Sequence, residues 1–133
     1  MKTKILFWLL PAILFAGCAA GRPEIALETE KLVLGEVVNG EVVARDVTVY
    51  NRGASPLSVE ALVTTCGCTS ATLEPMTIPP GGSGVLHIEF DSGAHGPDLI
   101  GELLRQVIIV SDDPERPEVV LNIEANVLPR IPR

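Results

Sequence analysis

The sequence predicts an all-β protein, an immunoglobulin-like antiparallel β-sandwich of about seven strands that follows a cleaved signal peptide. Three observations support this fold class. From Val42 onward, apolar residues recur at every second position, which is the strand period. Turn residues separate these short runs, and no long amphipathic helical pattern is present. Strands at this spacing are more typical of a two-sheet sandwich than of a barrel.

The N-terminal segment has the layout of an export signal. Lys2 and Lys4 precede a short apolar run that ends at Ala16-Gly17-Cys18. A basic start, a short apolar core and small residues at the cut are what export machinery recognises. We therefore predict a signal peptide over residues 1–17. The end of this segment resembles the lipobox of bacterial lipoproteins, although Phe15 stands where leucine is most common.

The lipobox resemblance implies that Cys18 is diacylated on sulfur and anchors the protein to a membrane. An ordinary signal peptide cut near Ala19 is the alternative, and it would also export the chain. Residues 18–24 are then a lipidated tether. We expect a cell-envelope location on the periplasmic face, with the outer membrane favoured over the inner, because no aspartate follows Cys18.

The first two predicted strands of the domain, which spans residues 25–128, cover 32–38 and 42–50. Asn39-Gly40 lies between them and readily takes the positive backbone angles of a tight hairpin, so we expect the two strands to pair. Asn51-Arg52-Gly53 then ends the second strand.

The middle strands show clear alternation. Leu57, Val59, Ala61 and Val63 fall on one face of a half-buried strand. After a turn at residues 79–82, we expect an inward face that consists of Leu86, Ile88 and Phe90, and an outward face that consists of Val85, His87 and Glu89.

Two strands complete the domain. The strand at 103–110 is closed by Asp112-Asp113-Pro114. The last strand has the clearest alternation, and its predicted inward residues are Val119, Leu121, Ile123, Ala125 and Val127. Residues 129–133 have no apolar period and are predicted to be a disordered tail.

Charge and composition argue against a nucleic-acid partner. The full sequence has a formal net charge of -7, and loss of Lys2 and Lys4 makes the exported chain more acidic. An acidic surface repels phosphate backbones, and the few aromatic residues leave no platform for stacking bases.

Cys66-Gly67-Cys68-Thr69 is the most specific motif in the domain. The surrounding turn motifs are Asn51-Arg52-Gly53, Pro56-Leu57, Ile78-Pro79-Pro80-Gly81, Phe90-Asp91 and Asp112-Asp113-Pro114. Together they resemble the bacterial family called domain of unknown function 1573, over about residues 25–127. The resemblance implies an immunoglobulin-like fold related to modules of ciliary scaffold proteins, and it brings no established reaction.

Cys66 and Cys68 support several chemistries. With Cys18 lipidated, they form an even pair, which favours a disulfide in an oxidising compartment. Such a bond closes a small ring, so we expect it to be reduced more easily than a structural disulfide. The thiolates can alternatively bind Cu(I), with Met76, His87 or His95 as weaker candidate ligands. The structural alternative is a buried cysteine pair, or a disulfide that only fixes a loop.

Catalytic signatures are missing from the sequence, so we expect no enzyme. The segment 81–85 fails the nucleophile-elbow pattern, because Val85 stands where the second glycine is needed. The leading hypothesis is a lipid-anchored envelope protein that uses its immunoglobulin-like domain to bind or scaffold a partner protein of the envelope. The alternative is a copper-binding or thiol-redox protein centred on Cys66 and Cys68. An architectural protein without a discrete ligand also remains open.

Overall fold

The computed structural model describes residues 21–132, so the predicted signal peptide and Cys18 lie outside the described residues. Within that range the chain forms nine strands and no helix. None of residues 21–132 therefore belongs to a helix able to cross a membrane. The strands are β1 (Ile25–Leu27), β2 (Lys31–Val38), β3 (Val42–Asn51), β4 (Leu57–Thr64), β5 (Thr69–Glu74), β6 (Thr77–Ile78), β7 (Ser83–Asp91), β8 (Gly101–Ser111) and β9 (Glu118–Leu128).

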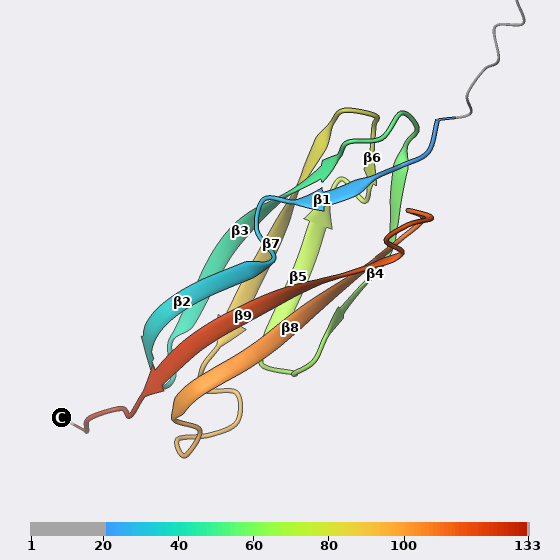
Figure 1. Ribbon diagram of the computed structural model, residues 1–133. Coiled ribbons are helices and arrows are strands. Elements are labelled where there is room, and N and C mark those ends of the chain that lie inside the picture. The colour runs from blue at the N-terminus through green and yellow to red at the C-terminus, as the bar shows by residue number, and fades with distance from the viewer. Residues whose placement is uncertain (1–20, 133) are drawn as a thin grey trace, which may run out of the picture.

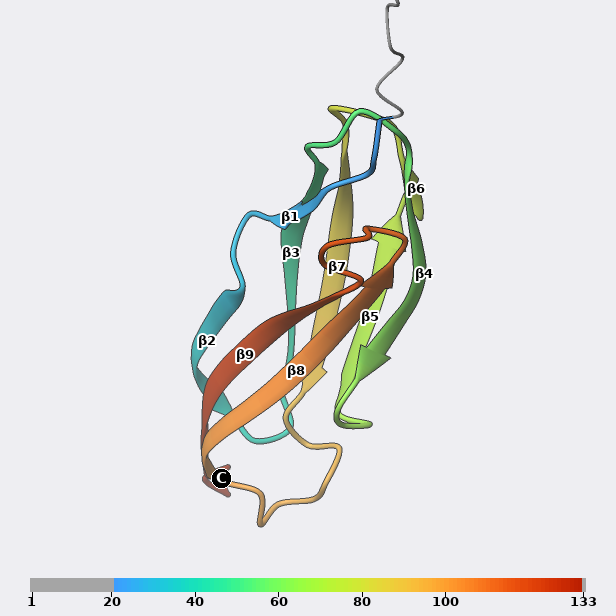
Figure 2. The same ribbon diagram turned by 45° about the vertical axis from the view of Figure 1, so that its right-hand side comes forward.

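The strands form two sheets that pack face to face (Figures 1 and 2). One sheet has the order β1-β3-β7-β5, and the other has the order β2-β9-β8-β4-β6. The predicted β-sandwich is confirmed. The pairing of β2 with β9 is parallel, whereas every other strand pair is antiparallel.

The core lies between the sheets and follows the predicted alternation on β7 and β9. On β7, Leu86, Ile88 and Phe90 are buried, and the residues between them are exposed. On β9 the five predicted inward residues are all buried, including Leu121, which is 0% exposed. Regular alternation places one face of each strand in the core, so the two sheets share one hydrophobic interior.

The predicted pairing across Asn39-Gly40 is wrong. β2 lies beside β9 in one sheet, and β3 lies beside β7 in the other, so the turn crosses between the sheets. Gly40 does have a positive φ of 94°, as the dipeptide suggests. Asn39, however, is buried, and its amide donates to the carbonyls of Ser92, Gly96 and Leu99. Those bonds tie the turn to the loop between β7 and β8.

The predicted face of β4 holds for only half of the strand. Leu57 and Val59 are buried, but a bulge between Val59 and Ala61 shifts the register against β8. Beyond it Val63 is 47% exposed, and Leu62 packs against the core instead. An extra residue in one strand moves every later side chain to the opposite face.

Two buried polar side chains organise the end of the sandwich near Gly21. Asn51 donates to the carbonyls of Ser55 and Ile78, and it accepts from the backbone N–H of Gly53. Asp113 lies in the turn between β8 and β9 and accepts from the backbone N–H of Ile25 at 2.8 Å. Asp113 therefore connects the two sheets at this end.

Candidate functional site at the Cys66–Cys68 turn

The cysteine motif forms the turn that carries the chain from β4 in one sheet to β5 in the other. Cys66 and Cys68 are joined by a disulfide. Cys68 is 2% exposed and belongs to the hydrophobic core, whereas Cys66 is half-buried and packs against that core. A Cβ at Gly67 would meet nothing within 4 Å, so open space surrounds the middle of the turn. One sulfur is thus buried, and the other belongs to the more accessible cysteine.

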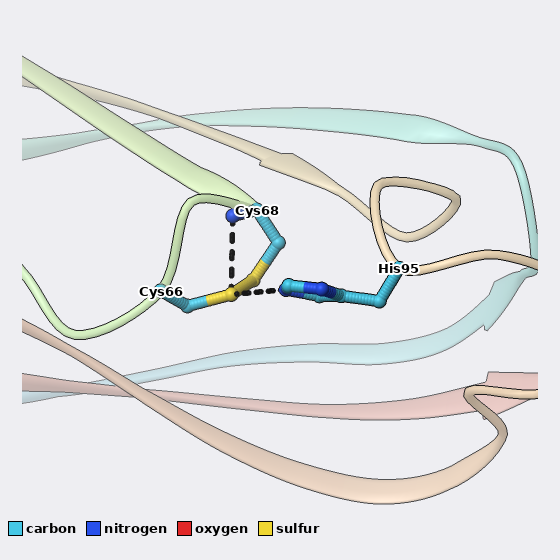
Figure 3. Close-up of side chains that lie close together, drawn as sticks. All are labelled: Cys66, Cys68 and His95. Carbon is cyan, nitrogen blue, oxygen red and sulfur yellow. Dashed lines mark hydrogen bonds between the residues drawn. A yellow bond between two sulfur atoms is a disulfide. The ribbon is translucent and has the colours of Figure 1, made fainter.

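His95 reaches the disulfide from the loop between β7 and β8. Its Nε2 lies 3.0 Å from Cys66 Sγ, and Figure 3 shows the exposed His95 side chain pointing its ring at that sulfur. A disulfide sulfur carries no proton, so the ring nitrogen is the donor in this contact. The three bonds from the Asn39 amide hold the loop that carries His95. His95 was a weaker candidate from sequence, since its spacing from the cysteines marks no known site.

Arg105 was not predicted, yet it brings a positive charge to the site. It lies on β8, and its Nε donates to Cys68 Sγ at 3.4 Å. Sequence periodicity contains a signal for it. Arg105 has the same phase as Val107 and Ile109, which are buried, so it is an arginine on the inward face of its strand. A cation at the margin of a core needs a partner.

The other two candidate ligands lie elsewhere. Met76 follows β5, whereas Cys68 precedes it, so the strand separates the two residues. Met76 is 41% exposed. His87 points outward from β7, where its Nδ1 lies 2.6 Å from Asp46 Oδ1. This hydrogen bond to Asp46 raises the pKa of His87 above its ordinary value. Neither residue joins the cysteine cluster, and His87 has a carboxylate partner of its own.

One protein-family model matches most of the chain. The family model described as protein of unknown function (DUF1573) matches residues 25–127, the whole sandwich apart from Leu128. The chain belongs to the DUF1573 family. The resemblance found from the Cys66-Gly67-Cys68-Thr69 motif and the turn motifs is therefore confirmed. A comparison with curated proteins finds no match.

Solved structures similar to this DUF1573 domain show the same fold. A protein of unknown function from Porphyromonas gingivalis W83 is 24% identical with a TM-score of 0.72, over 78% of this chain and 46% of that chain. The chain thus spans about half the length of the Porphyromonas protein. The ASH / PapD-like domain of human CEP192 is 9% identical with a TM-score of 0.62, over 98% of this chain and 100% of that domain. The E. coli chaperone DraB is 16% identical with a TM-score of 0.51, over 80% of this chain and 55% of that chain.

Each sulfur of the DUF1573 site has two hydrogen-bond donors. Cys66 Sγ accepts hydrogen bonds from His95 Nε2 and from the backbone N–H of Cys68, each at 3.0 Å. Cys68 Sγ accepts a hydrogen bond from Arg105 Nε, and the Thr69 hydroxyl lies 3.7 Å from the same sulfur. Donors and cations of this kind stabilise a thiolate more than they stabilise a neutral thiol or a disulfide. The surroundings therefore favour the reduced state more than an apolar pocket would.

Covalent stapling alone explains this disulfide poorly. The bonded cysteines in this DUF1573 domain are two positions apart in sequence. In a chain-entropy treatment, so short a loop stabilises the fold by roughly 1.6 kcal/mol, against about 3 kcal/mol for a loop of about fifteen residues. The hydrogen-bond donors around both sulfurs are present in addition to this covalent link.

Proposed function

We propose that this protein is a lipid-anchored protein of the cell envelope whose immunoglobulin-like domain binds a partner polypeptide and exchanges disulfides with it. One observation supports the exchange above all. The accessible cysteine of the disulfide lies beside His95, while Arg105 contacts the buried sulfur that an attack would release. The sequence ranked partner binding before redox chemistry, and the surroundings of the two sulfurs join both in one role.

The exchange step follows from the accessibility of the two sulfurs. A thiolate of the partner attacks Cys66 Sγ, a bond forms between the two sulfurs, and the Cys66–Cys68 bond breaks. The electron pair of that bond stays on Cys68 Sγ, where Arg105 and the Thr69 hydroxyl stabilise the thiolate. A second thiol of the partner then displaces Cys66. The partner dithiol is oxidised to a disulfide, and the cysteine pair is reduced to two thiols.

The reverse step uses His95. In the reduced protein, Cys66 is the more accessible of the two thiols and attacks the partner, and the imidazole beside its sulfur is placed to accept its proton. Cys68 then resolves the mixed disulfide. In both directions, Cys66 therefore forms the mixed disulfide with the partner, and Cys68 is the thiolate that leaves or resolves it.

The partner site in this proposal is the edge of β5. β5 begins at Thr69, directly after Cys68, and among residues 21–132 it pairs with β7 alone. An extended polypeptide that adds a strand to such an edge gains backbone hydrogen bonds. A cysteine at the end of that strand would then meet Cys66. The exchange in this proposal is stoichiometric, in keeping with the expectation that the protein is no enzyme.

The anchor in this proposal is Cys18. Gly21 lies near Ala54 beyond the end of β3, whereas the loop that carries His95 touches Gly40 before the start of β3. The two regions therefore lie at opposite ends of the sandwich (Figure 1). A lipid just ahead of Gly21 would leave the disulfide facing away from the membrane and toward periplasmic partners.

The lipid anchor is tested by Cys18→Ser in the exported protein. We expect this variant to leave the membrane fraction for the soluble fraction with an unchanged thermal unfolding curve, because Cys18 precedes the folded domain. Fractionation and circular dichroism measure the two quantities. A variant that stays on the membrane would refute lipid attachment at Cys18.

The exchange role is tested on the soluble Cys18→Ser domain by its rate of reduction with a small dithiol. We expect Arg105→Gln to slow this reduction by about tenfold, because the released Cys68 thiolate loses its cation. The equilibrium reduction potential should fall by roughly 30 mV for each 1.4 kcal/mol of lost thiolate stabilisation. Quenched thiol alkylation followed by mass measurement gives both quantities.

Arg45→Gln is the matched control for this experiment. Arg45 donates to the carbonyl of Ala44 just as Arg105 donates to that of Leu104, but Arg45 contacts neither sulfur. We expect the rate and potential of Arg45→Gln to equal those of the parent domain. Equal rates for both variants would contradict the leaving-group role of Arg105. A disulfide that resists the dithiol altogether would remove the exchange function.

A further inference from the structure

We propose that Cys66, Cys68 and His95 form a binding site for a Cu(I) ion when the disulfide is reduced. The ligand atoms of these three residues all lie within 4.8 Å of one another. Two thiolates and an imidazole are soft or intermediate donors, the set that Cu(I) prefers. The inference rests on the proposed function in one respect, because both need a disulfide that can be reduced.

The metal site forms in two balanced steps. A dithiol first reduces the Cys66–Cys68 bond and is itself oxidised to a disulfide, which leaves two thiols on the protein. Cu(I) then replaces the two thiol protons, which pass to solvent, and the metal ion keeps its oxidation state. Two sulfurs on one ion lie about 4 Å apart when each metal–sulfur bond is about 2.3 Å. The open space around Gly67 allows the turn to widen until the sulfurs reach that separation.

The number of donors favours Cu(I) over Zn(II). Among residues 21–132, the cluster offers three ligand residues, and neither Met76 nor His87 belongs to it. A closed zinc site takes four protein ligands in a tetrahedral arrangement. Cu(I) is satisfied by two or three donors, so the cluster is complete for Cu(I) and incomplete for structural zinc.

The charge of the surroundings supports the same choice. Two thiolates and one Cu(I) ion carry a net charge of minus one, which the Arg105 guanidinium beside Cys68 Sγ neutralises. Two thiolates and one Zn(II) ion are already neutral, so Arg105 would add an uncompensated positive charge at the margin of the core. A neutral cluster costs less to bury than a charged one.

Asn39 places the histidine ligand before the metal arrives. Its amide donates to the carbonyls of Ser92, Gly96 and Leu99, on both sides of His95. These bonds fix the loop while leaving the ring free to contact sulfur. Asn39 is therefore a positioning residue for the site, and removal of its amide should weaken metal binding without removal of a ligand.

The test is a Cu(I) titration of the soluble Cys18→Ser domain. The protein is reduced with a phosphine without oxygen, the phosphine is removed, and the free thiols are counted by alkylation and mass measurement. Cu(I) is then added in competition with a coloured Cu(I) chelator. We expect a single Cu(I) ion per chain, bound by the reduced protein only, and much weaker binding of Zn(II) under the same conditions.

Single-residue variants distinguish the metal ligands from the residues around them. Cys66→Ser and Cys68→Ser should abolish tight binding. His95→Ala should weaken it by more than Asn39→Ala, for which we expect a loss of about tenfold. His87→Ala is the matched control, since it removes the other histidine of the chain, which lies outside the cluster and pairs with Asp46. It should bind Cu(I) as the parent does.

Each of the following results would contradict the proposed Cu(I) site. Free thiols that take up no Cu(I) would refute the metal site and leave disulfide exchange intact. Thiols that never form under reduction would refute both proposals. His95→Ala protein with unchanged Cu(I) affinity would show binding by the cysteines alone and refute the three-residue site. Preference for Zn(II) would refute the assignment of the ion.

Discussion

Leu121→Asp is expected to leave the domain unfolded. Leu121 is 0% exposed at the middle of β9, a strand flanked by β2 and β8, and it pairs in register with Val107, which is also 0% exposed. A carboxyl at this position has no partner and must lose its hydration or force the two sheets apart. We expect a loss of about 5 kcal/mol or more, which equals the whole stability of many domains of this size. Circular dichroism and thermal unfolding of the soluble domain measure the effect.

Asn122→Asp is the matched control for the position of the charge. Asn122 is the next residue of β9, and its side chain accepts from Gln106 Nε2 at 2.9 Å on the outward face. A carboxylate accepts the same hydrogen bond, so we expect a change of about 0.5 kcal/mol or less. A folded Leu121→Asp protein, together with an unfolded Asn122→Asp protein, would mean that the faces of β9 are reversed.

The strand faces could be predicted from sequence wherever a strand is regular. β7 and β9 keep the period of two along their whole length, so alternation alone placed Phe90 and Leu121 in the core. The prediction for β4 was wrong beyond Val59, because a bulge is a backbone event that leaves no sign in the apolar pattern.

The Asn39-Gly40 turn shows a second limit. The dipeptide predicts a tight turn from its own backbone preferences, and Gly40 has the expected positive φ. Whether the flanking strands pair depends on tertiary contacts, and here the three bonds of the Asn39 amide connect the turn to another loop. Local propensity contains no information about those carbonyls.

Only part of the candidate site could be predicted from the sequence. The cysteine pair could be found from sequence, since the two residues are neighbours in a short motif. His95 is 29 positions from Cys66, and Arg105 is 37 positions from Cys68. Their approach to the sulfurs depends on how the loop after β7 and the start of β8 fold over the turn. Only the inward phase of Arg105 offered a sequence signal.

Asp113→Ala is expected to cost about 3 kcal/mol of the free energy of unfolding. Asp113 is 2% exposed, and its carboxylate accepts from the backbone N–H groups of Ile25, Glu115 and Arg116. Hydrogen bonds to a charged acceptor are stronger than those to a neutral one, and alanine would leave a buried donor on Ile25 unpaired. The first strand would then lose its connection to the opposite sheet. Denaturant unfolding of the soluble domain measures the difference.

Asp112→Ala is the control for Asp113→Ala, one residue away. Asp112 is exposed and accepts one backbone bond, from Ser58 at 2.8 Å. We expect its loss to cost about 1 kcal/mol. Equal losses for the two variants would contradict the claim that Asp113 connects the sheets, since the Asp112 carboxyl would then contribute as much to the free energy of unfolding.

Asp113→Asn adds a pH test of the same carboxylate. Burial alone would raise the pKa of Asp113, but the N–H groups of Ile25, Glu115 and Arg116 and the charge of Arg116 hold it below the ordinary 3.8. A carboxyl with a lowered pKa contributes stability that is present above 3.8 and is lost as the pH falls through the folded-state pKa. Asparagine can offer its one oxygen either to Ile25 or to the Glu115 and Arg116 pair, and it does not titrate. The stability gap between the parent and Asp113→Asn should therefore be constant from pH 5 to 7, at about 2 kcal/mol, and should shrink in acid. A gap that does not change with pH would mean that the charge of Asp113 contributes nothing to the fold.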